Sequence, residues 1–522
     1  MEKKKNTSKV DFNKIKEILI DVLKKVGAFV KKIVVLIKKL LNFLSKKKVG
    51  NFNGAQIFVG AIVLILLVLI LNIGKGKQVA YPVIYNTSEG DLYLVDTEVD
   101  SHENAVKLGN GESTSHVVYA NTTDRYVLFQ KNESLYLYDA KEADETTEVI
   151  SDVEDYFFSE DDKYIVALDD DGNLYVYDYK DKEKIEKDVT HIYAHSEDKV
   201  LYEKENILYV RSINPKKDDR LKVTEGYDAY VGFSEDGKNI IYLDNDRNLR
   251  IFNIKKDEDE KIASKVSSYY CDKKSCEKLF YVENDDTKTI YYYDGKTSKS
   301  LSKDIYSINA YDVDKKQIVF SKAVDGEYNL YYQKVGGDAQ IIEKGITSLR
   351  TVKLFEGKDI YYINSDNELK YVRIRGEKVS SLKHIGDDVT GYLYLHKKGY
   401  VFVGDVKNNL GTLYLAKSGN VKQIDEKVNA TLITVGNKGN SIYYLKDYQT
   451  TGDLYVSKGG KGKEIEKDVY NYEYVKDNLI YLIKDYSVSK SRGDLYRYTN
   501  KSVLIVEDVT RMASIPVYFE LD

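Results

Sequence analysis

The sequence lacks tryptophan and has few cysteines, methionines and prolines: none, two, two and three, respectively, among 522 residues. No G-x-S-x-G elbow is present, so the chain carries no counterpart of the serine-peptidase domains that accompany some repeat proteins. It also has no H-E-x-x-H motif, and GGKGKE (459–464) lacks the spacing and the Ser or Thr of a phosphate-binding loop. We therefore predict no catalytic, cofactor-binding or metal-binding residues and no cofactor.

Tyrosine is abundant, with 48 residues, and the composition is 42% hydrophobic and 31% charged, which is typical of a globular rather than a disordered chain. Tyrosine and the β-branched residues favour strands. No helical period of useful length follows Gln78, which excludes helical solenoids. At 522 residues the chain is too long for one ordinary domain.

One long apolar run divides the chain. Ile57–Ile73 holds seventeen residues without a charge, just enough at about 1.5 Å per residue to cross a hydrocarbon core of about 30 Å. We predict a transmembrane helix over residues 55–74. The alternative is a cleaved signal peptide, but 48 residues precede the run and the cleavage signal after it is weak.

Charge is distributed unevenly around this run. Residues 1–48 carry fifteen Lys against four acidic residues, or +11, and Lys75 and Lys77 add +2. Since the whole chain is −5, the part from Gln78 onward carries −18. The positive-inside rule then predicts a cell-membrane protein crossing once, with a cytoplasmic N-terminus and an extracytoplasmic body. So acidic a body also argues against binding nucleic acid.

The basic head, residues 1–48, has a helical pattern from Val10 to Leu44. Lysine pairs recur every seven residues and share one helix face, namely Lys24, Lys25, Lys31, Lys32, Lys38 and Lys39. Mostly apolar residues fill the wide arc between them. This pattern favours an amphipathic helix lying on the lipid bilayer with its lysines in the headgroups. A helical oligomerisation segment is the alternative.

The body from residue 79 to 522 repeats a Gly/Asn-Leu-Tyr-x-x-Asp core at intervals of 34 to 44 residues, which indicates one supersecondary unit copied along the chain. The eleven copies are GDLYLVD (90–96), ESLYLYD (133–139), GNLYVYD (172–178), NILYVRS (206–212), RNLRIFN (247–253), KTIYYYD (288–294), YNLYYQK (328–334), NELKYVR (367–373), GTLYLAK (411–417), GDLYVSK (452–458) and GDLYRYT (493–499).

One unit, residues 228–266, shows the content of the repeat. We predict strands at Tyr230–Ser234, Asn239–Leu243, Asn248–Ile254 and Lys261–Val266, with a Gly-containing turn after the first. Four antiparallel strands in about 40 residues make one propeller blade. The third strand is apolar or aromatic on both faces, as a blade packed between two neighbours requires.

The segments FSEDGKNIIYLD (233–244) and FSEDDKYIVALD (158–169) resemble the WD40-like (PD40-type) repeat of TolB-type bacterial β-propellers. The usual Pro of that motif is Glu here, and the Trp-Asp pair of eukaryotic WD repeats is absent. The resemblance covers roughly residues 80–522 and implies an all-β propeller fold of about eleven four-stranded repeats. Because eleven exceeds the usual ring of about four to eight blades, we expect two tandem rings dividing near residues 265–310, and one large ring or an open array of blades is the alternative.

Cys271 and Cys276 flank the turn between the first two strands of their repeat. Across a hairpin in an oxidising compartment they could form a disulfide, while free thiols are the alternative. With no histidine nearby, a zinc site is not expected. His191 and His195 lie in a strand, about 13 Å apart at about 3.3 Å per residue, and are expected to be surface or packed residues.

Proteins that carry the TolB-type repeat, which this sequence resembles, serve mostly as binding platforms. We therefore expect a membrane-anchored, non-catalytic binding, scaffold or sensor module whose partner is a protein, a peptide or a glycan such as a cell-wall polymer. The alternative is a lyase or hydrolase acting on an extracellular polymer, with its active site in a propeller channel. Such an enzyme would need His, Arg or carboxylate side chains converging on one rim.

Overall fold

The computed structural model describes residues 83–95, 102, 105–110, 118–120, 125–139, 146–217, 219–228, 231–272, 274–284, 287–390, 392–436, 438–476 and 479–514. Lys77–Asp522 form one compact unit. The expected basic helix and the expected span at 55–74 lie outside the described residues. Among the residues that are described, no helix has the length and apolar character needed to cross a membrane.

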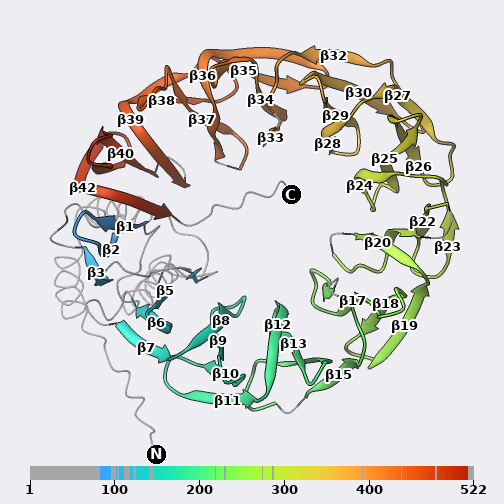
Figure 1. Cartoon of the computed structure of the whole chain (residues 1–522), viewed down its shortest axis with the longest axis horizontal. Helices are drawn as coiled ribbons and strands as arrows, with labels where there is room; N and C mark the ends of the chain where they lie inside the picture. Colours follow the sequence, from blue (N-terminus) through green and yellow to red (C-terminus); the bar gives the residue numbers. More distant parts are fainter. Residues whose placement is uncertain are drawn as a thin grey trace, which may run out of the picture. The chain divides into compact units, whose positions relative to one another are not determined.

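Seven of the described sheets are built from consecutive antiparallel strands, four in each, with a fifth, β32, in the last (Figure 1). Their strands are β4 (Val118–Tyr119), β5 (Tyr126–Lys131), β6 (Ser134–Asp139), β7 (Thr146–Ile150), β8 (Val153–Phe158), β9 (Ile165–Asp169), β10 (Leu174–Tyr177), β11 (Lys182–Glu186), β12 (Val189–Ser196), β13 (Lys199–Lys204), β14 (Ile207–Ser212), β15 (Leu221–Thr224), β16 (Val231–Phe233), β17 (Asn239–Leu243), β18 (Leu249–Asn253), β19 (Glu258–Ala263), β20 (Val266–Cys271), β21 (Leu279–Glu283), β22 (Thr289–Tyr293), β23 (Ser298–Ser300), β24 (Ser307–Asp312), β25 (Gln317–Val324), β26 (Glu327–Lys334), β27 (Gln340–Ile346), β28 (Leu349–Phe355), β29 (Asp359–Asn364), β30 (Leu369–Arg375), β31 (Lys378–Val379) and β32 (Lys383–Gly386).

The other strands form one continuous path of thirteen. They are β1 (Val83–Thr87), β2 (Asp91–Val95), β3 (Val106–Asn110), β33 (Tyr394–His396), β34 (Gly399–Lys407), β35 (Leu410–Lys417), β36 (Asn420–Gly436), β37 (Ser441–Lys446), β38 (Gly452–Ser457), β39 (Lys463–Lys476), β40 (Leu479–Ser487), β41 (Arg492–Tyr498) and β42 (Ser502–Ser514). The long strands β36, β39 and β42 each pair on one side in their first half and on the other in their second half, so each ends one blade and begins the next. This path therefore holds four blades, and the described part of the chain holds eleven.

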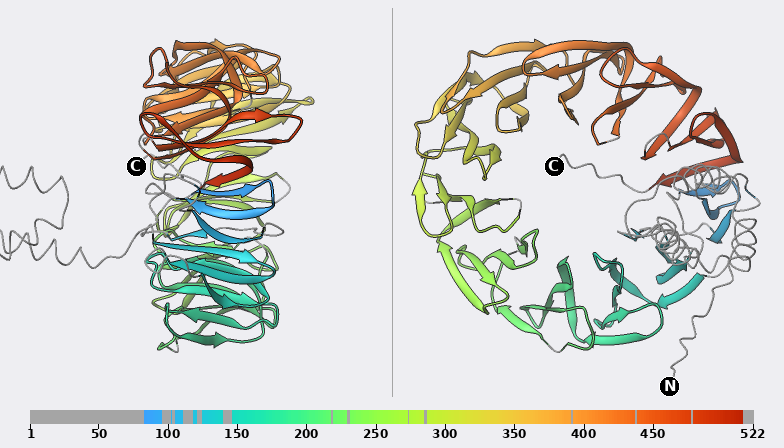
Figure 2. Two further views of the ribbon diagram at one scale, coloured as in Figure 1. Left: turned by 90° about the vertical axis from the view of Figure 1, so that its left-hand side faces the viewer. Right: turned by 180° about the vertical axis from the view of Figure 1, so that it is seen from behind.

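The first and last strands close the ring. β1 pairs antiparallel with the second half of β42, with Tyr85 opposite Met512 and Asn86 opposite Arg511. In both views of Figure 2 the strands coloured blue lie beside those coloured red. The expected division into two tandem rings near residues 265–310 is wrong. Each of two rings would need its own closing strand pair, and among the described residues that interval carries β20 to β24 of the single ring.

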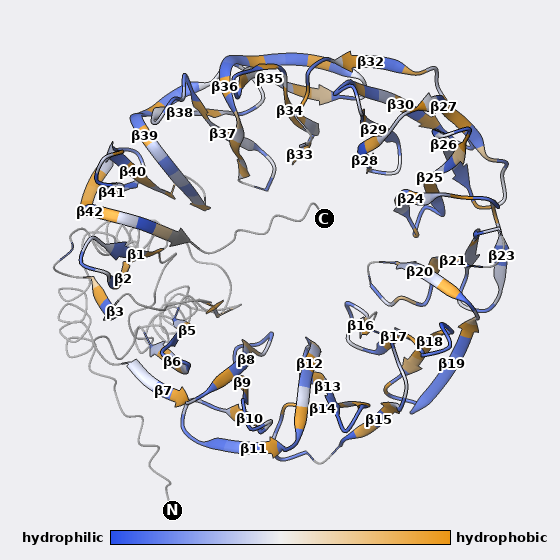
Figure 3. Cartoon of the chain, in the orientation of Figure 1, coloured by the Kyte–Doolittle hydropathy of each residue, from blue (hydrophilic) through white to orange (hydrophobic). Residues whose placement is uncertain are grey.

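The blade β16–β19 matches the predicted unit in its first three strands and departs in the fourth, which spans Glu258–Ala263 rather than 261–266. Val266 instead begins β20, the inner strand of the next blade. The sequence pattern predicts the start of the fourth strand three residues too late, because the exposed segment Glu258–Lys261 resembles a charged loop. Outer strands such as β11 and β19 are hydrophilic along most of their length (Figure 3), since one of their edges faces solvent.

The third strand of each blade packs on both faces, as predicted. In β10, Leu174 and Val176 join a core with the β12–β15 blade, which includes Val200 and Tyr202. Tyr175 on the opposite face packs into the core shared with the β4–β7 blade. Each fully buried aliphatic or aromatic side chain contributes on the order of 1.5–3 kcal/mol, so the stability of the ring lies largely between blades.

A recurring polar clasp also joins neighbouring blades. A carboxylate on the outer strand of one blade accepts hydrogen bonds from a tyrosine hydroxyl and a lysine of the next. The described residues contain three such clasps: Glu186 with Tyr202 and Lys204, Glu343 with Tyr362 and Lys370, and Asp425 with Tyr444 and Lys446. Each tyrosine thus fills the interface with its ring and pairs its hydroxyl at the rim.

We predict that Asp425→Ala lowers the free energy of unfolding by about 2–3 kcal/mol, because it leaves the Tyr444 hydroxyl, at 2.9 Å, and the Lys446 ammonium, at 2.6 Å, without their acceptor in a largely buried site. Urea unfolding of the full chain measures the loss. Glu258→Ala is the matched control, since its pair with Lys256 spans 3.9 Å and is exposed, and should cost less than about 0.5 kcal/mol. Equal losses in the two variants would contradict the clasp.

The Glu186 clasp predicts a defined acid sensitivity. Burial works to raise the pKa of Glu186, but hydrogen bonds, first from Lys204, lower it from 4.5 to about 2. The clasp therefore stabilises the fold above pH 4.5 and is lost as the pH falls toward about 2. Glu186→Gln should lower the free energy of unfolding by about 1 kcal/mol at neutral pH and leave it unchanged at the acid end of this pH range. Urea midpoints measured at a series of pH values test this. Glu183→Gln, exposed on the same strand, should show no such convergence.

Candidate functional site: a groove at the ring closure

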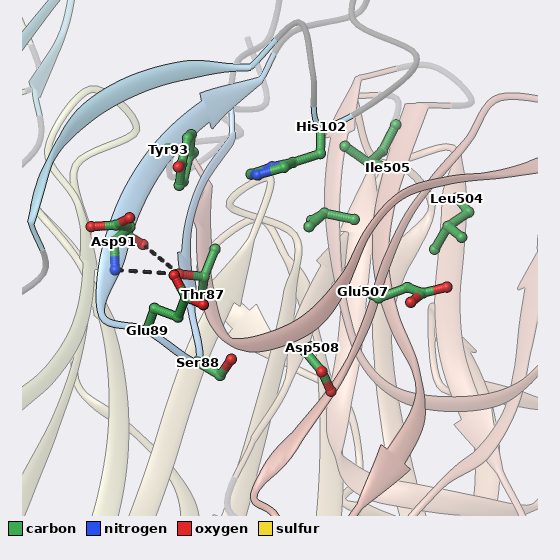
Figure 4. A pocket seen from close by; sticks show the side chains of 11 residues that line it. Thr87, Ser88, Glu89, Asp91, Tyr93, His102, Leu504, Ile505, Glu507 and Asp508 are labelled. Atoms are coloured by element: carbon green, nitrogen blue, oxygen red, sulfur yellow. Dashed lines mark hydrogen bonds between the residues drawn. The ribbon is translucent and has the colours of Figure 1, made fainter.

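A cleft of about 550 Å³ opens where the first blade meets the last (Figure 4). Its walls come from the β1–β2 hairpin, from His102 and from the first half of β42. The lining residues are Thr87, Ser88, Glu89, Asp91, Tyr93, His102, Leu504, Ile505, Val506, Glu507 and Asp508. The antiparallel pairing of β1 with β42 holds the two walls together, so the groove exists only because the ring closes.

One wall is aromatic. Tyr85 and Tyr93 stand opposite each other on β1 and β2, and their rings stack with centroids 5.6 Å apart. His102 presents its ring to Tyr93 at 4.6 Å and places Nδ1 2.6 Å from the Tyr85 hydroxyl. Burial, and then the neighbouring Tyr93, raises the pKa of Tyr85, so its hydroxyl stays protonated. The histidine is thereby held at the wall of the groove (Figure 4).

The facing wall is apolar and carries acidic ends. Leu504 is 39% exposed, and Ile505 beside it is buried in the core of the closing blade. Glu507 and Asp508 follow on the same strand, and Glu89 and Asp91 face the groove from the hairpin (Figure 4).

Two of these four carboxylates are neutralised by neighbours. Asp91 accepts from Lys107 Nζ at 2.6 Å, and Asp508 pairs with Arg492 Nε at 3.0 Å. Within the part of the chain that the structure describes, the carboxylates of Glu89 and Glu507 accept no hydrogen bond and form no ion pair, and both residues are exposed, although Lys107 interacts electrostatically with Glu89. The groove thus combines an aromatic wall, an apolar wall and two exposed carboxylates that have no ion-pair partner among the described residues. That combination suits a ligand with both cationic and apolar groups.

Sequence reasoning did not find this site. Its two walls are separated by about four hundred residues, and none of the lining residues forms a motif. The site could be located only from the long-range pairing of the first and last strands. No local sequence pattern reveals that pairing.

The predicted cysteine site lies elsewhere, at the turn between β20 and β21. Cys271 ends β20, Cys276 lies in the turn, and both are thiols in this structure. The lysines proposed to contact the membrane surface, from Lys24 to Lys39, lie outside the described residues. For them and for the cysteine disulfide the expectation stays a prediction.

The two histidines of β12 are packed against aromatic rings. His195 stacks on Phe157 of the preceding blade with ring centroids 3.9 Å apart, and His191 meets Tyr193 edge-on at 4.6 Å. Two bulges in the pairing of β12 with β13 set their directions. Asp155 of β8 interacts electrostatically with both histidines, while partial burial raises its pKa.

Two acidic turns, at 169–173 and 244–248, join antiparallel strands as hairpin turns. Asp169 Oδ1 accepts from the Asn173 amide at 2.6 Å, and its Oδ2 accepts from the Asn173 side chain at 2.9 Å. Asp244 holds Asn248 in the same way, with both distances 2.8 Å. These carboxylates are occupied by the turn backbone and are not arranged around a cation.

One further group could hold a metal ion among the described residues. Donor atoms of Glu368, His384 and Asp387 lie within 4.8 Å of one another on the blade that contains β30 and β32. Sequence reasoning missed this group, because the residues are spread over twenty positions. Glu368 already accepts from Lys370 at 3.2 Å and from Asn364 at 2.9 Å, so a cation would compete with a resident ammonium group.

No protein-family model and no curated protein matches the chain. Solved structures with similar backbones include a eukaryotic initiation factor, at a TM-score of 0.40 and 10% identity over 83% of this chain and 98% of that chain. Another is the tricorn protease, at a TM-score of 0.29 and 12% identity over 84% of this chain and 47% of that chain. These likenesses are too weak to argue from. The strand pairing itself defines a β-propeller-like fold.

Proposed function

We propose that the propeller is a binding module whose ligand is a cationic peptide segment with apolar side chains, seated in the groove at the ring closure. The observation that carries this proposal is the pair of exposed carboxylates without an ion-pair partner among the described residues, Glu89 and Glu507, between an aromatic and an apolar wall. The formal charge of −18 from Gln78 onward adds a long-range attraction for such a partner. A propeller-like fold is itself consistent with a binding or scaffold role.

The same proposal includes a place in the cell. The apolar run Ile57–Ile73 anchors the chain in the membrane, the basic head stays in the cytoplasm on the lipid surface, and the propeller faces outside. The support is the hydropathy of the run and the change of charge across it. The FSEDGK and FSEDDK turns support kinship with TolB-type propellers, which are binding platforms.

The groove predicts a specific charge dependence of binding. The probe is a fluorescent peptide that alternates Lys and Leu, measured by anisotropy with the full chain at low salt. Replacing Glu89 and Glu507 together by Gln should weaken binding about tenfold, because two attractive charges at the mouth are lost. Leu504→Ser should weaken it independently by removing exposed apolar surface.

The matched control removes two exposed charges from another blade, through Glu235→Gln and Asp257→Asn. This control changes the net charge by the same amount but at another blade. It should therefore leave most of the affinity for the peptide in place. If both double variants weaken the peptide to the same extent, the binding is a general effect of the acidic body and the groove is not the site.

The topology predicts where each end of the chain lies. A fusion of alkaline phosphatase to the C-terminus should be active in intact bacterial cells, because that enzyme needs an oxidising extracytoplasmic environment, and a fluorescent protein fused to the N-terminus should remain folded. Replacing the six paired lysines from Lys24 to Lys39 by Gln tests the head separately. An inactive C-terminal fusion beside a stable, full-length protein would contradict the proposed orientation.

A further inference from the structure

The two cysteines of the chain are brought to one turn. Cys271 is the last residue of β20 and pairs with Leu279 of β21, and Cys276 lies between them in the connecting turn. Cys276 is 8% exposed and has a left-handed backbone with φ of +53°. Such a conformation is uncommon for a residue with a side chain and needs support from its surroundings.

Asp272 supplies that support. Its Oδ1 accepts the amides of Lys274, Ser275 and Cys276 at 3.0, 2.8 and 3.2 Å, and its Oδ2 accepts the amide of Lys278 at 3.0 Å. Burial works to raise the pKa of Asp272, but these backbone hydrogen bonds lower it, so the carboxylate stays charged. The turn is therefore fixed around one side chain, and Cys276 is held in place with it.

Both thiols lie at this turn. The neighbouring Cys276, and then burial, raises the pKa of the Cys271 thiol. Cys276 Sγ also lies 3.8 Å from the Asp272 carbonyl oxygen. Both side chains belong to the same apolar cluster between blades. The pair is thus pre-positioned, which raises the effective concentration of one thiol at the other.

The turn also touches the neighbouring blade. The Lys274 carbonyl accepts the amide of Asp236 at 3.0 Å, and the Ser275 carbonyl accepts the side-chain amide of Asn239 at 3.0 Å. Asn239 is buried and sits at the start of β17. A covalent constraint on residues 271–276 would therefore act on the junction between the two blades and not on the turn alone.

We propose that Cys271 and Cys276 form a dithiol–disulfide pair that fixes this inter-blade junction when oxidised. The oxidant is an external disulfide. A thiolate of the pair attacks it and releases one external thiol, and the second cysteine then attacks the mixed disulfide and releases the other. One sulfur–sulfur bond forms within the turn as one breaks in the oxidant, and two protons pass to the two thiols released.

The test incubates the full-length protein with oxidised glutathione, alkylates the remaining thiols and maps the peptides by mass. The expected product is a peptide with an internal bond between Cys271 and Cys276, lighter by two hydrogen atoms. Oxidation should also slow hydrogen exchange of the Asp236 amide. Cys271→Ser and Cys276→Ser should each give only the mixed glutathione disulfide. Persistent free thiols, or two mixed disulfides, in the wild type would overturn the proposal.

The role of Asp272 gives a second measure that does not depend on the cysteine variants. Asp272→Ala should lower the ratio of internal to mixed disulfide by about fivefold or more, because the hydrogen bonds that hold Cys276 are lost. Asp161→Ala is the matched control, since Asp161 holds the corresponding turn of another blade through Lys163 and Ser159. An unchanged ratio in Asp272→Ala would show that the turn does not pre-position the thiols.

Discussion

The pairing of β1 with β42 is the constraint on which the ring depends. Each blade buries both faces against neighbours, so an open end would expose a sheet covered with Leu, Val and Tyr side chains. Joining residues 83–87 to 509–514 covers both ends at once and leaves no unpaired inner edge there. The cost is entropic, because the two ends of the chain must meet, but loop-closure entropy grows only slowly with length.

Tyrosine explains how blades so similar in sequence hold together without tryptophan. The aromatic rings of Tyr202 and Tyr444 are fully buried, yet each hydroxyl donates to a carboxylate of the preceding blade. Phenylalanine would fill the same space but would remove the hydroxyl that donates to the carboxylate. The clasps therefore relate two features of the composition that otherwise look unrelated. The tyrosines donate hydrogen bonds, and the acidic residues of the outer strands accept them.

The sequence predicts what is local and periodic in this fold. The Leu-Tyr strand, the turn at Gly237 and the number of repeats follow from spacing and turn chemistry, and Gly237 has the expected positive φ of +63°. The fourth strand, Glu258–Ala263, is misplaced because an outer strand with one exposed edge is as polar as a loop. The ring count and the groove depend on β1 meeting β42, a contact between distant segments that local patterning cannot express.

The groove and the cysteine turn both lie between blades, for a common reason. Inside a blade, strand pairing satisfies the backbone and apolar packing covers both faces, so few polar groups are left to meet a ligand. At a junction, side chains from two neighbouring blades meet. The closure junction leaves Glu89 and Glu507 without an ion-pair partner among the described residues, and the β20–β21 turn, which carries two thiols, accepts a hydrogen bond from Asn239 of its neighbour. Each of these two places thus combines residues from two neighbouring blades.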